Sequence, residues 1–189
     1  MVRNRPRVAA ACLHLRTFSI KHCALACDLT SLTLPSPLPP PTPEGDVKIA
    51  QSNAIFRYLA KKAGLLGDTD AEFAMSEMLI EEGVDLFGMM GKAHYSEDKA
   101  KGFNDLFAAD GPAAKHMACL DRLPLASLCE GERRVAGAIY LAATLDMLVN
   151  LEPTVLDASP NVKAFFESTV ALPAFGNGIR DLSPYFTRE

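Results

Sequence analysis

The sequence predicts an α+β chain in which a short strand and a helix precede a larger, all-helical domain. Apolar residues recur at helical spacing through most of residues 70–171. The alternation typical of a strand is found after residue 43 only at residues 47–49. The composition, with 49% hydrophobic and 22% charged residues, supplies enough apolar side chains for a folded core.

Residues 1–43 differ in composition from the remainder of the chain. They carry a net charge of +4, which leaves −8 on the other residues. Six of the 13 prolines lie in residues 35–43 and predict an extended linker, because each fixes φ and removes a backbone donor. Residues 1–30 are rich in arginine and poor in acidic residues, as transit peptides are. A transit peptide, a linker and a mispredicted start are the interpretations left open.

The charge and the cysteines argue against several classes of function. A net charge of −4 and a pI near 5.6 provide no basic field for nucleic acid or an anionic membrane. Five cysteines without regular spacing argue against a disulfide framework, so a cytoplasmic location is expected, or an organelle if a transit peptide is present. His22, Cys23 and Cys27 lack the further ligands of a closed zinc site, and no metal site is predicted.

A short edge strand and a helix are the first predicted elements. Turn residues at 44–46 precede the alternating residues 47–49. Apolar residues at helical spacing then predict a helix over residues 51–64. Ser52 is the expected N-cap of this helix, and Gly64 suits the left-handed position that ends it.

The remaining chain is predicted to be helical. The last helix is expected to have Ser159 as its N-cap and Pro160 as its first residue. From Val135 to Leu145 the residues are apolar or small on every side, which is typical of a helix buried all round. We therefore expect a domain built around that helix, within a set of helices over about residues 70–95, 98–123, 134–150 and 160–171.

Gln51 and Ser52 are the residues that most suggest binding chemistry. The start of a helix presents backbone N–H groups and the positive end of the helix dipole, both of which attract anions. A serine hydroxyl there can add a hydrogen bond, so a small carboxylate is a suitable ligand. An ordinary N-cap is the alternative interpretation.

Residues 46–60, DVKIAQSNAIFRYLA, resemble the glutathione-contacting strand and helix of cytosolic glutathione S-transferases, nearest to the sigma and mu classes. The resemblance continues through residues 64–67 and into residues 79–86, LIEEGVDL, which match the first helix of that family's C-terminal domain. Residues 151–174 resemble the closing helices of the same domain. The resemblance therefore covers residues 44–189.

The resemblance implies three regions and a function. An atypical basic, proline-rich segment over residues 1–43 is followed by an incomplete thioredoxin-like part, 44–66, and an all-α C-terminal domain of the glutathione S-transferase type, 67–189. The implied activity is conjugation of glutathione to a small hydrophobic electrophile by a homodimer. Glutathione is then a co-substrate, and no further cofactor is expected.

The resemblance also implies roles for particular residues. Gln51 and Ser52 would bind the γ-glutamyl end of glutathione, and Asp85 of the partner subunit would meet its amino group. The alternative for Asp85 is a solvated residue beside Glu81 and Glu82, and this acidic trio could also attract a divalent ion. The second-substrate pocket, for which helical core is the alternative, would be lined by Phe87, Met89, Met90 and Tyr95.

The sequence departs from the family at two places. The catalytic Tyr, Ser or Cys of the family has no recognisable match in residues 1–43, so no catalytic residue is assigned. A non-catalytic binding module and an inactive truncated product therefore stay as alternative functions. The second departure concerns a Ser/Thr-x-x-Asp capping box of the family, whose positions are occupied here by Val135 and Ala138. The lost cap is predicted to lower the stability of the protein by about 1 kcal/mol. Val135→Thr with Ala138→Asp is expected to raise the melting temperature.

Overall fold

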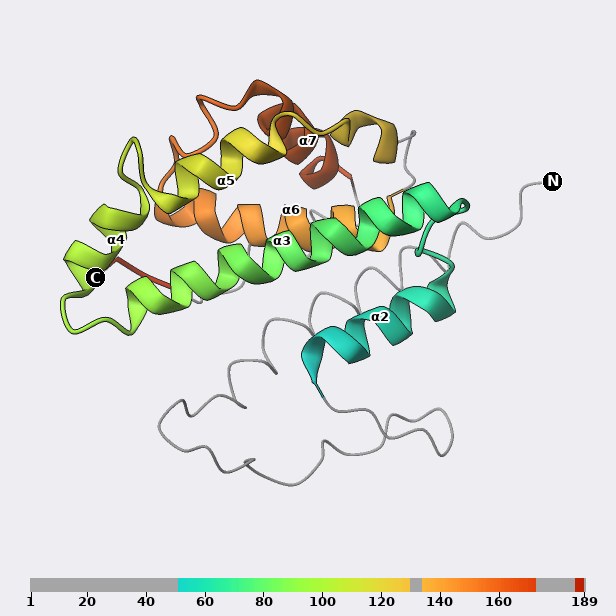
Figure 1. The fold of residues 1–189 in the computed structure, drawn as a ribbon, viewed down its shortest axis with the longest axis horizontal. Coiled ribbons are helices and arrows are strands. Elements are labelled where there is room, and N and C mark those ends of the chain that lie inside the picture. Colours follow the sequence, from blue (N-terminus) through green and yellow to red (C-terminus); the bar gives the residue numbers. More distant parts are fainter. Residues whose placement is uncertain (1–50, 130–133, 173–185, 189) are drawn as a thin grey trace. The chain divides into compact units, whose positions relative to one another are not determined.

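The structure is a computed structural model that describes residues 51–129, 134–172 and 186–188 (Figure 1). The chain divides into two compact units, Met1–Leu65 and Leu66–Glu189. All regular elements within these described ranges are helical. The predicted strand and the interpretations of the first 43 residues lie outside the described residues.

Helix α2 (Ser52–Ala63) belongs to the first unit, and it begins differently from the prediction. Its N-cap is Gln51, so the prediction that Ser52 is the cap is wrong, and Ser52 is instead the first helical residue. The end of α2 was predicted correctly. Gly64 has the left-handed φ of 69°, and its backbone N–H donates to the Lys61 carbonyl.

The second unit contains the larger helical domain. The prediction of one continuous helix over residues 98–123 is wrong, because this segment forms two helices. The first of them ends at Leu106, and the second begins at Pro112, whose fixed φ suits the first position of a helix and which disfavours helical backbone at Gly111. The elements are α3 (Asp70–His94), α4 (Lys99–Leu106), α5 (Pro112–Leu120), the 3₁₀ turn η1 (Leu125–Leu128), α6 (Ala136–Leu151) and α7 (Pro160–Val170).

Helix α6 is the core helix of this domain, as predicted. Leu141, Leu145 and Leu148 have no exposed surface. The long helix α3 runs alongside α6, and two glycines bring the helices close together (Figure 1). A Cβ atom on Gly83 would lie 2.6 Å from the Tyr140 ring, and one on Gly137 only 2.0 Å from the Ser76 carbonyl oxygen.

The start of α6 is capped from a different helix. Val135 is the N-cap, as the sequence indicated, and its side chain accepts no hydrogen bond. The prediction that this helix start lacks a cap is nevertheless only partly correct. The Ser76 hydroxyl of α3 accepts a hydrogen bond from the Gly137 backbone N–H at 2.8 Å. Ser76 is completely buried. A side chain distant in sequence therefore supplies part of what the missing capping box would have provided.

Helix α7 is likewise capped by a side chain that is distant in sequence. Ser159 and Pro160 occupy the predicted positions, but the Ser159 side chain makes no capping hydrogen bond. Asp121 provides the cap instead, with Oδ1 accepting from the backbone N–H groups of Asn161 at 2.7 Å and Val162 at 3.1 Å. The α7 start is thereby fixed to the segment that follows α5.

We expect Asp121→Ala to lower the free energy of unfolding by about 1 kcal/mol, because two N–H groups at the start of α7 lose their acceptor. Thermal unfolding of the whole chain measures this loss. Asp157→Ala is the matched control, since Asp157 forms only an exposed ion pair with Lys163 at 2.7 Å. Equal losses of stability in the two variants would contradict the capping role of Asp121.

Candidate functional site

The start of α2 has a strained backbone at the predicted binding residue. Gln51 has φ 74° and ψ 120°, and it is the only non-glycine residue with positive φ in the described part of the chain. Such a conformation costs on the order of 1–3 kcal/mol, and residues that adopt it cluster at active sites and ligand-binding sites. Gln51 is exposed and Ser52 is half-buried. The predicted pair therefore lies at an accessible helix end.

The charges of α2 favour an anion at this end. The helix has no acidic residue in its first turn, whereas Lys61 and Lys62 lie in its last turn. No acidic side chain of α2 therefore compensates the positive end of its dipole. As the first helical residue, Ser52 presents both a hydroxyl and a backbone N–H at that end. These groups are suited to binding a carboxylate.

Asp85 lies on α3, in the second unit. Its side chain is exposed and forms no hydrogen bond or ion pair with any residue that the structure describes. Glu82 differs, because its carboxylate contacts His116 Nδ1 of α5 at 2.5 Å. The acidic trio therefore does not act as one cluster. Over the described ranges, no group of three or more His, Cys, Asp or Glu residues is placed to hold a metal ion.

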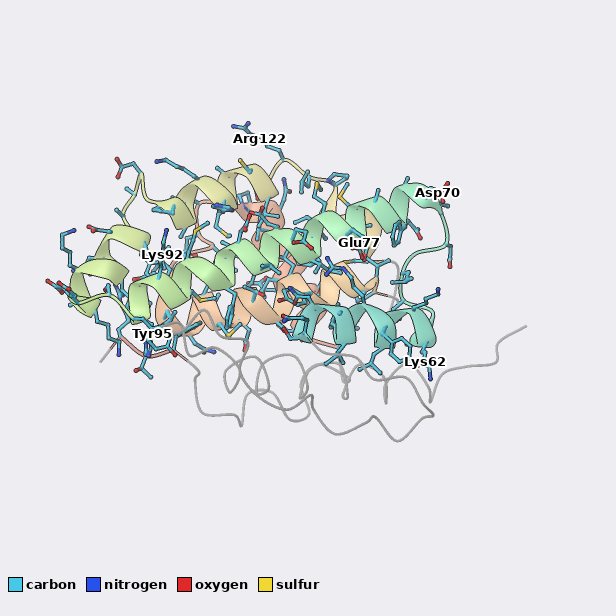
Figure 2. All side chains as sticks on the ribbon, turned by 60° about the horizontal axis from the view of Figure 1, so that its bottom comes forward. Lys62, Asp70, Glu77, Lys92, Tyr95 and Arg122 are labelled. Carbon is cyan, nitrogen blue, oxygen red and sulfur yellow. The ribbon has the colours of Figure 1, made fainter. Side chains whose placement is uncertain are left out.

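The predicted pocket residues lie in the C-terminal half of α3, which ends beside Tyr95 (Figure 2). Phe87 and Met89 are half-buried, and the Tyr95 side chain is 65% exposed. Met90 is completely buried and its side chain is part of the core. Of the four residues, Phe87, Met89 and Tyr95 thus have surface available to a ligand.

His94 and Phe186 belong to an aromatic cluster at this end of α3 and were not predicted from the sequence. The Phe186 ring lies 5.2 Å from the Phe87 ring and 5.4 Å from the His94 ring, between centroids. The His94 ring meets Tyr95 edge-on at 4.9 Å. In the sequence, Phe186 is marked only as an aromatic residue followed by the polar residues Thr187 and Arg188. Its partners, however, are distant along the chain.

The cysteines in the described residues are Cys119, which is exposed, and Cys129, which is half-buried. Burial raises the pKa of the Cys129 thiol, and the nearby Arg134 only partly opposes this effect. Cys129 is therefore protonated at neutral pH and is a poor nucleophile.

None of the helices that can be described is both long and apolar enough to cross a membrane.

No family model matches the chain. Sequence comparison nevertheless finds glutathione S-transferases among the relatives of this chain. Glutathione S-transferase Mu 4 of Mus musculus is 31% identical over 160 residues, which cover 77% of this chain and 67% of that protein. The class-mu 26 kDa isozyme of Schistosoma japonicum is 32% identical over 133 residues, covering 69% of this chain and 59% of that protein. The chain spans about two thirds of the length of the first of these relatives.

Two solved structures resemble the fold of this chain. The pi-class glutathione S-transferase of Onchocerca volvulus superposes with a TM-score of 0.61 at 27% identity, covering 70% of this chain and 65% of that one. Prostaglandin synthase D of Nilaparvata lugens superposes with a TM-score of 0.58 at 24% identity, covering 71% of this chain and 69% of that one. The second likeness concerns the fold alone.

Proposed function

Because this chain belongs to the glutathione S-transferase family and its relatives are of the mu class, we propose that it binds glutathione and conjugates it to a small hydrophobic electrophile. The strained Gln51 at the start of α2 is the observation that best supports this assignment. It lies where the sequence motif places the γ-glutamyl end of glutathione. We also propose that the protein is a cytoplasmic homodimer.

The proposed binding relies on complementary charges. Gln51 and Ser52 hold the γ-glutamyl carboxylate at the positive end of the α2 dipole. Asp85 of the partner subunit meets the γ-glutamyl ammonium group, which needs a carboxylate opposite it. The exposed Asp85 is available for such a contact, because it has no partner among the described side chains.

The proposed reaction is nucleophilic substitution by the glutathione thiolate. With a chloronitrobenzene substrate, a carbon–sulfur bond forms, the carbon–chlorine bond breaks, and chloride leaves with its electron pair. The thiol proton passes to solvent. Phe87, Met89 and Tyr95 of the second unit provide the apolar surface that receives the electrophile. No residue is assigned to stabilise the thiolate.

The first test is retention of the whole chain on immobilised glutathione. We expect Ser52→Ala to weaken glutathione binding about tenfold, because one hydrogen bond to a charged carboxylate is lost. Ser127→Ala is the control, since this exposed hydroxyl donates only to the Pro124 carbonyl. A wild-type chain that is never retained, or a Ser52→Ala chain retained as well as the wild type, would contradict the proposed site.

A second candidate function is non-catalytic binding of hydrophobic ligands by a transferase-like module. The sequence feature that favours it is the absence of any tyrosine before Tyr58, since tyrosine is one of the residues that activate the thiol in this family. Assay of the retained chain with 1-chloro-2,4-dinitrobenzene separates the two functions. Conjugation above the uncatalysed rate supports the transferase, and retention without conjugation supports the binding module.

A further inference from the structure

The C-terminal residues 186–188, called the clasp here, are bound to the helical domain through side chains of several elements. In Figure 1 the short red segment at the C-terminus lies beside α4 and the end of α3. Phe186 is only 3% exposed, in contact with the aromatic rings of α3. Thr187 accepts a hydrogen bond from Lys99 Nζ of α4 at 3.4 Å. The clasp is therefore held at a defined position against α3 and α4.

Arg188 anchors the clasp. Its Nη1 lies 2.9 Å from Glu152 Oε2, just beyond the end of α6, and its Nη2 donates to Asn104 Oδ1 of α4 at 3.3 Å. The guanidinium also lies over the Phe107 ring, 5.4 Å from the centroid. A hydrogen bond from the Thr154 hydroxyl, assisted by Arg188, holds the pKa of the Glu152 carboxyl below its usual value. Glu152 therefore stays charged at neutral pH.

Phe186 covers the aromatic surface at which we propose that the hydrophobic substrate binds. Its ring contacts Phe87, one of the proposed pocket residues, and His94. These are the contacts that an aromatic ligand on the same surface would make. Phe186 and such a ligand therefore compete for the same part of α3.

His94 gives an independent indication that this surface receives a ligand. Its Nδ1 is buried, and it is the single buried side-chain nitrogen or oxygen in the described residues that lacks a hydrogen-bond partner. Buried polar atoms are nearly always paired, and an unpaired one calls for an explanation. A ligand with a hydrogen-bonding group beside its aromatic ring would satisfy Nδ1, whereas the Phe186 ring does not.

We propose that the clasp is an autoinhibitory contact in which Phe186 occupies the aromatic surface of α3, Arg188 fixes it there, and an aromatic ligand must displace it to bind. The inference rests on the proposed function, because it concerns the same hydrophobic-substrate surface. The anchor is suited to opening, since the side chains of Arg188 and Glu152 are 38% and 26% exposed, and ion pairs of this exposure are weak. Ligand affinity then includes the cost of opening the clasp.

The test is a double-mutant cycle on the whole chain with 8-anilino-1-naphthalenesulfonate, an aromatic dye with one anionic group, as the probe. We expect Arg188→Ala to lower the dissociation constant of the dye about three- to tenfold, because the closed population falls. Phe186→Ala should lower it at least as much. The double variant should match Phe186→Ala alone, because Arg188 acts only through Phe186.

Two further variants keep this result interpretable. Lys163→Ala removes an exposed ion pair with Asp157 elsewhere in the domain and should leave dye binding unchanged. Arg188→Lys keeps the charge but not the planar fork, so its dissociation constant should lie between those of the wild type and Arg188→Ala. A stoichiometry of one dye per chain in every variant distinguishes opening of the clasp from general unfolding, in which several dyes bind.

An unchanged dissociation constant in Arg188→Ala, additive effects in the double variant, or weaker binding in Phe186→Ala would overturn the proposal. Retention on glutathione is measured in parallel and depends on α2 rather than on the clasp. If glutathione is retained but the cycle fails, only the clasp is disproved. If glutathione is not retained but the cycle behaves as expected, the proposed function fails and the competition at α3 stands.

Discussion

Gly137→Ala is expected to destabilise the helical domain by about 3 kcal/mol, near the upper end for overpacking of a core position. The added Cβ would lie 2.0 Å from the backbone carbonyl oxygen of Ser76, and backbone cannot rotate away as a side chain can. Helices α3 and α6 would have to separate along their contact. Thermal unfolding should show a melting temperature lower by on the order of 10 °C.

Gly88→Ala is the matched control for this variant. Gly88 also lies within a long helix, but nothing lies within 4 Å of the Cβ that the substitution adds. Alanine should therefore stabilise α3 by about 1 kcal/mol through its greater helix propensity. If Gly137→Ala were as well tolerated as Gly88→Ala, the close approach of α3 and α6 would be wrong.

Ser76→Ala is expected to lower the free energy of unfolding by about 2 kcal/mol, the cost of leaving a buried N–H without an acceptor. The N–H is that of Gly137 at the start of α6, and Ser76 has no exposed surface through which water could replace the hydroxyl. Chemical denaturation measures the loss. Ser127→Ala, at an exposed hydroxyl, should change stability by less than about 0.5 kcal/mol.

Val135→Thr tests whether the loss in Ser76→Ala is one of capping. Threonine has nearly the shape of valine, and at the N-cap position its hydroxyl can accept from the first turn of α6. The double variant should therefore recover part of the stability that Ser76→Ala loses. No recovery would show that Ser76 acts through packing alone. Ala138→Asp is a poorer change than the sequence indicated, because Ala138 is completely buried.

The contact between α3 and α6 also matters for the proposed function. One side of α3 is buried against α6, so the other side, which carries Asp85, is exposed. The register of the two helices, set at Gly83 and Gly137, thereby decides which α3 residues are exposed.

The sequence by itself determined the features that depend on near neighbours along the chain. The helix end at Gly64 and the start of α7 at Pro160 follow from conformational preference, and the burial of α6 follows from its apolar or small residues on every side. The motif around Gln51 and Ser52 was sufficient to indicate the family, which the comparisons then showed. The strained φ of Gln51 was not predicted, because a strained residue persists only when surrounding structure holds it.

Only the tertiary structure decided how the helix ends and the aromatic surface are completed. Ser76 caps a residue 61 positions away, and Asp121 caps one 40 positions away. Arg188 reaches Asn104 across 84 positions. Sequence periodicity reports which side chains share a helical face, and so it carries no information on which other helix meets that face. The partners of Ser76, Asp121 and Phe186 are fixed by packing of the helices, and are visible only once the chain has folded.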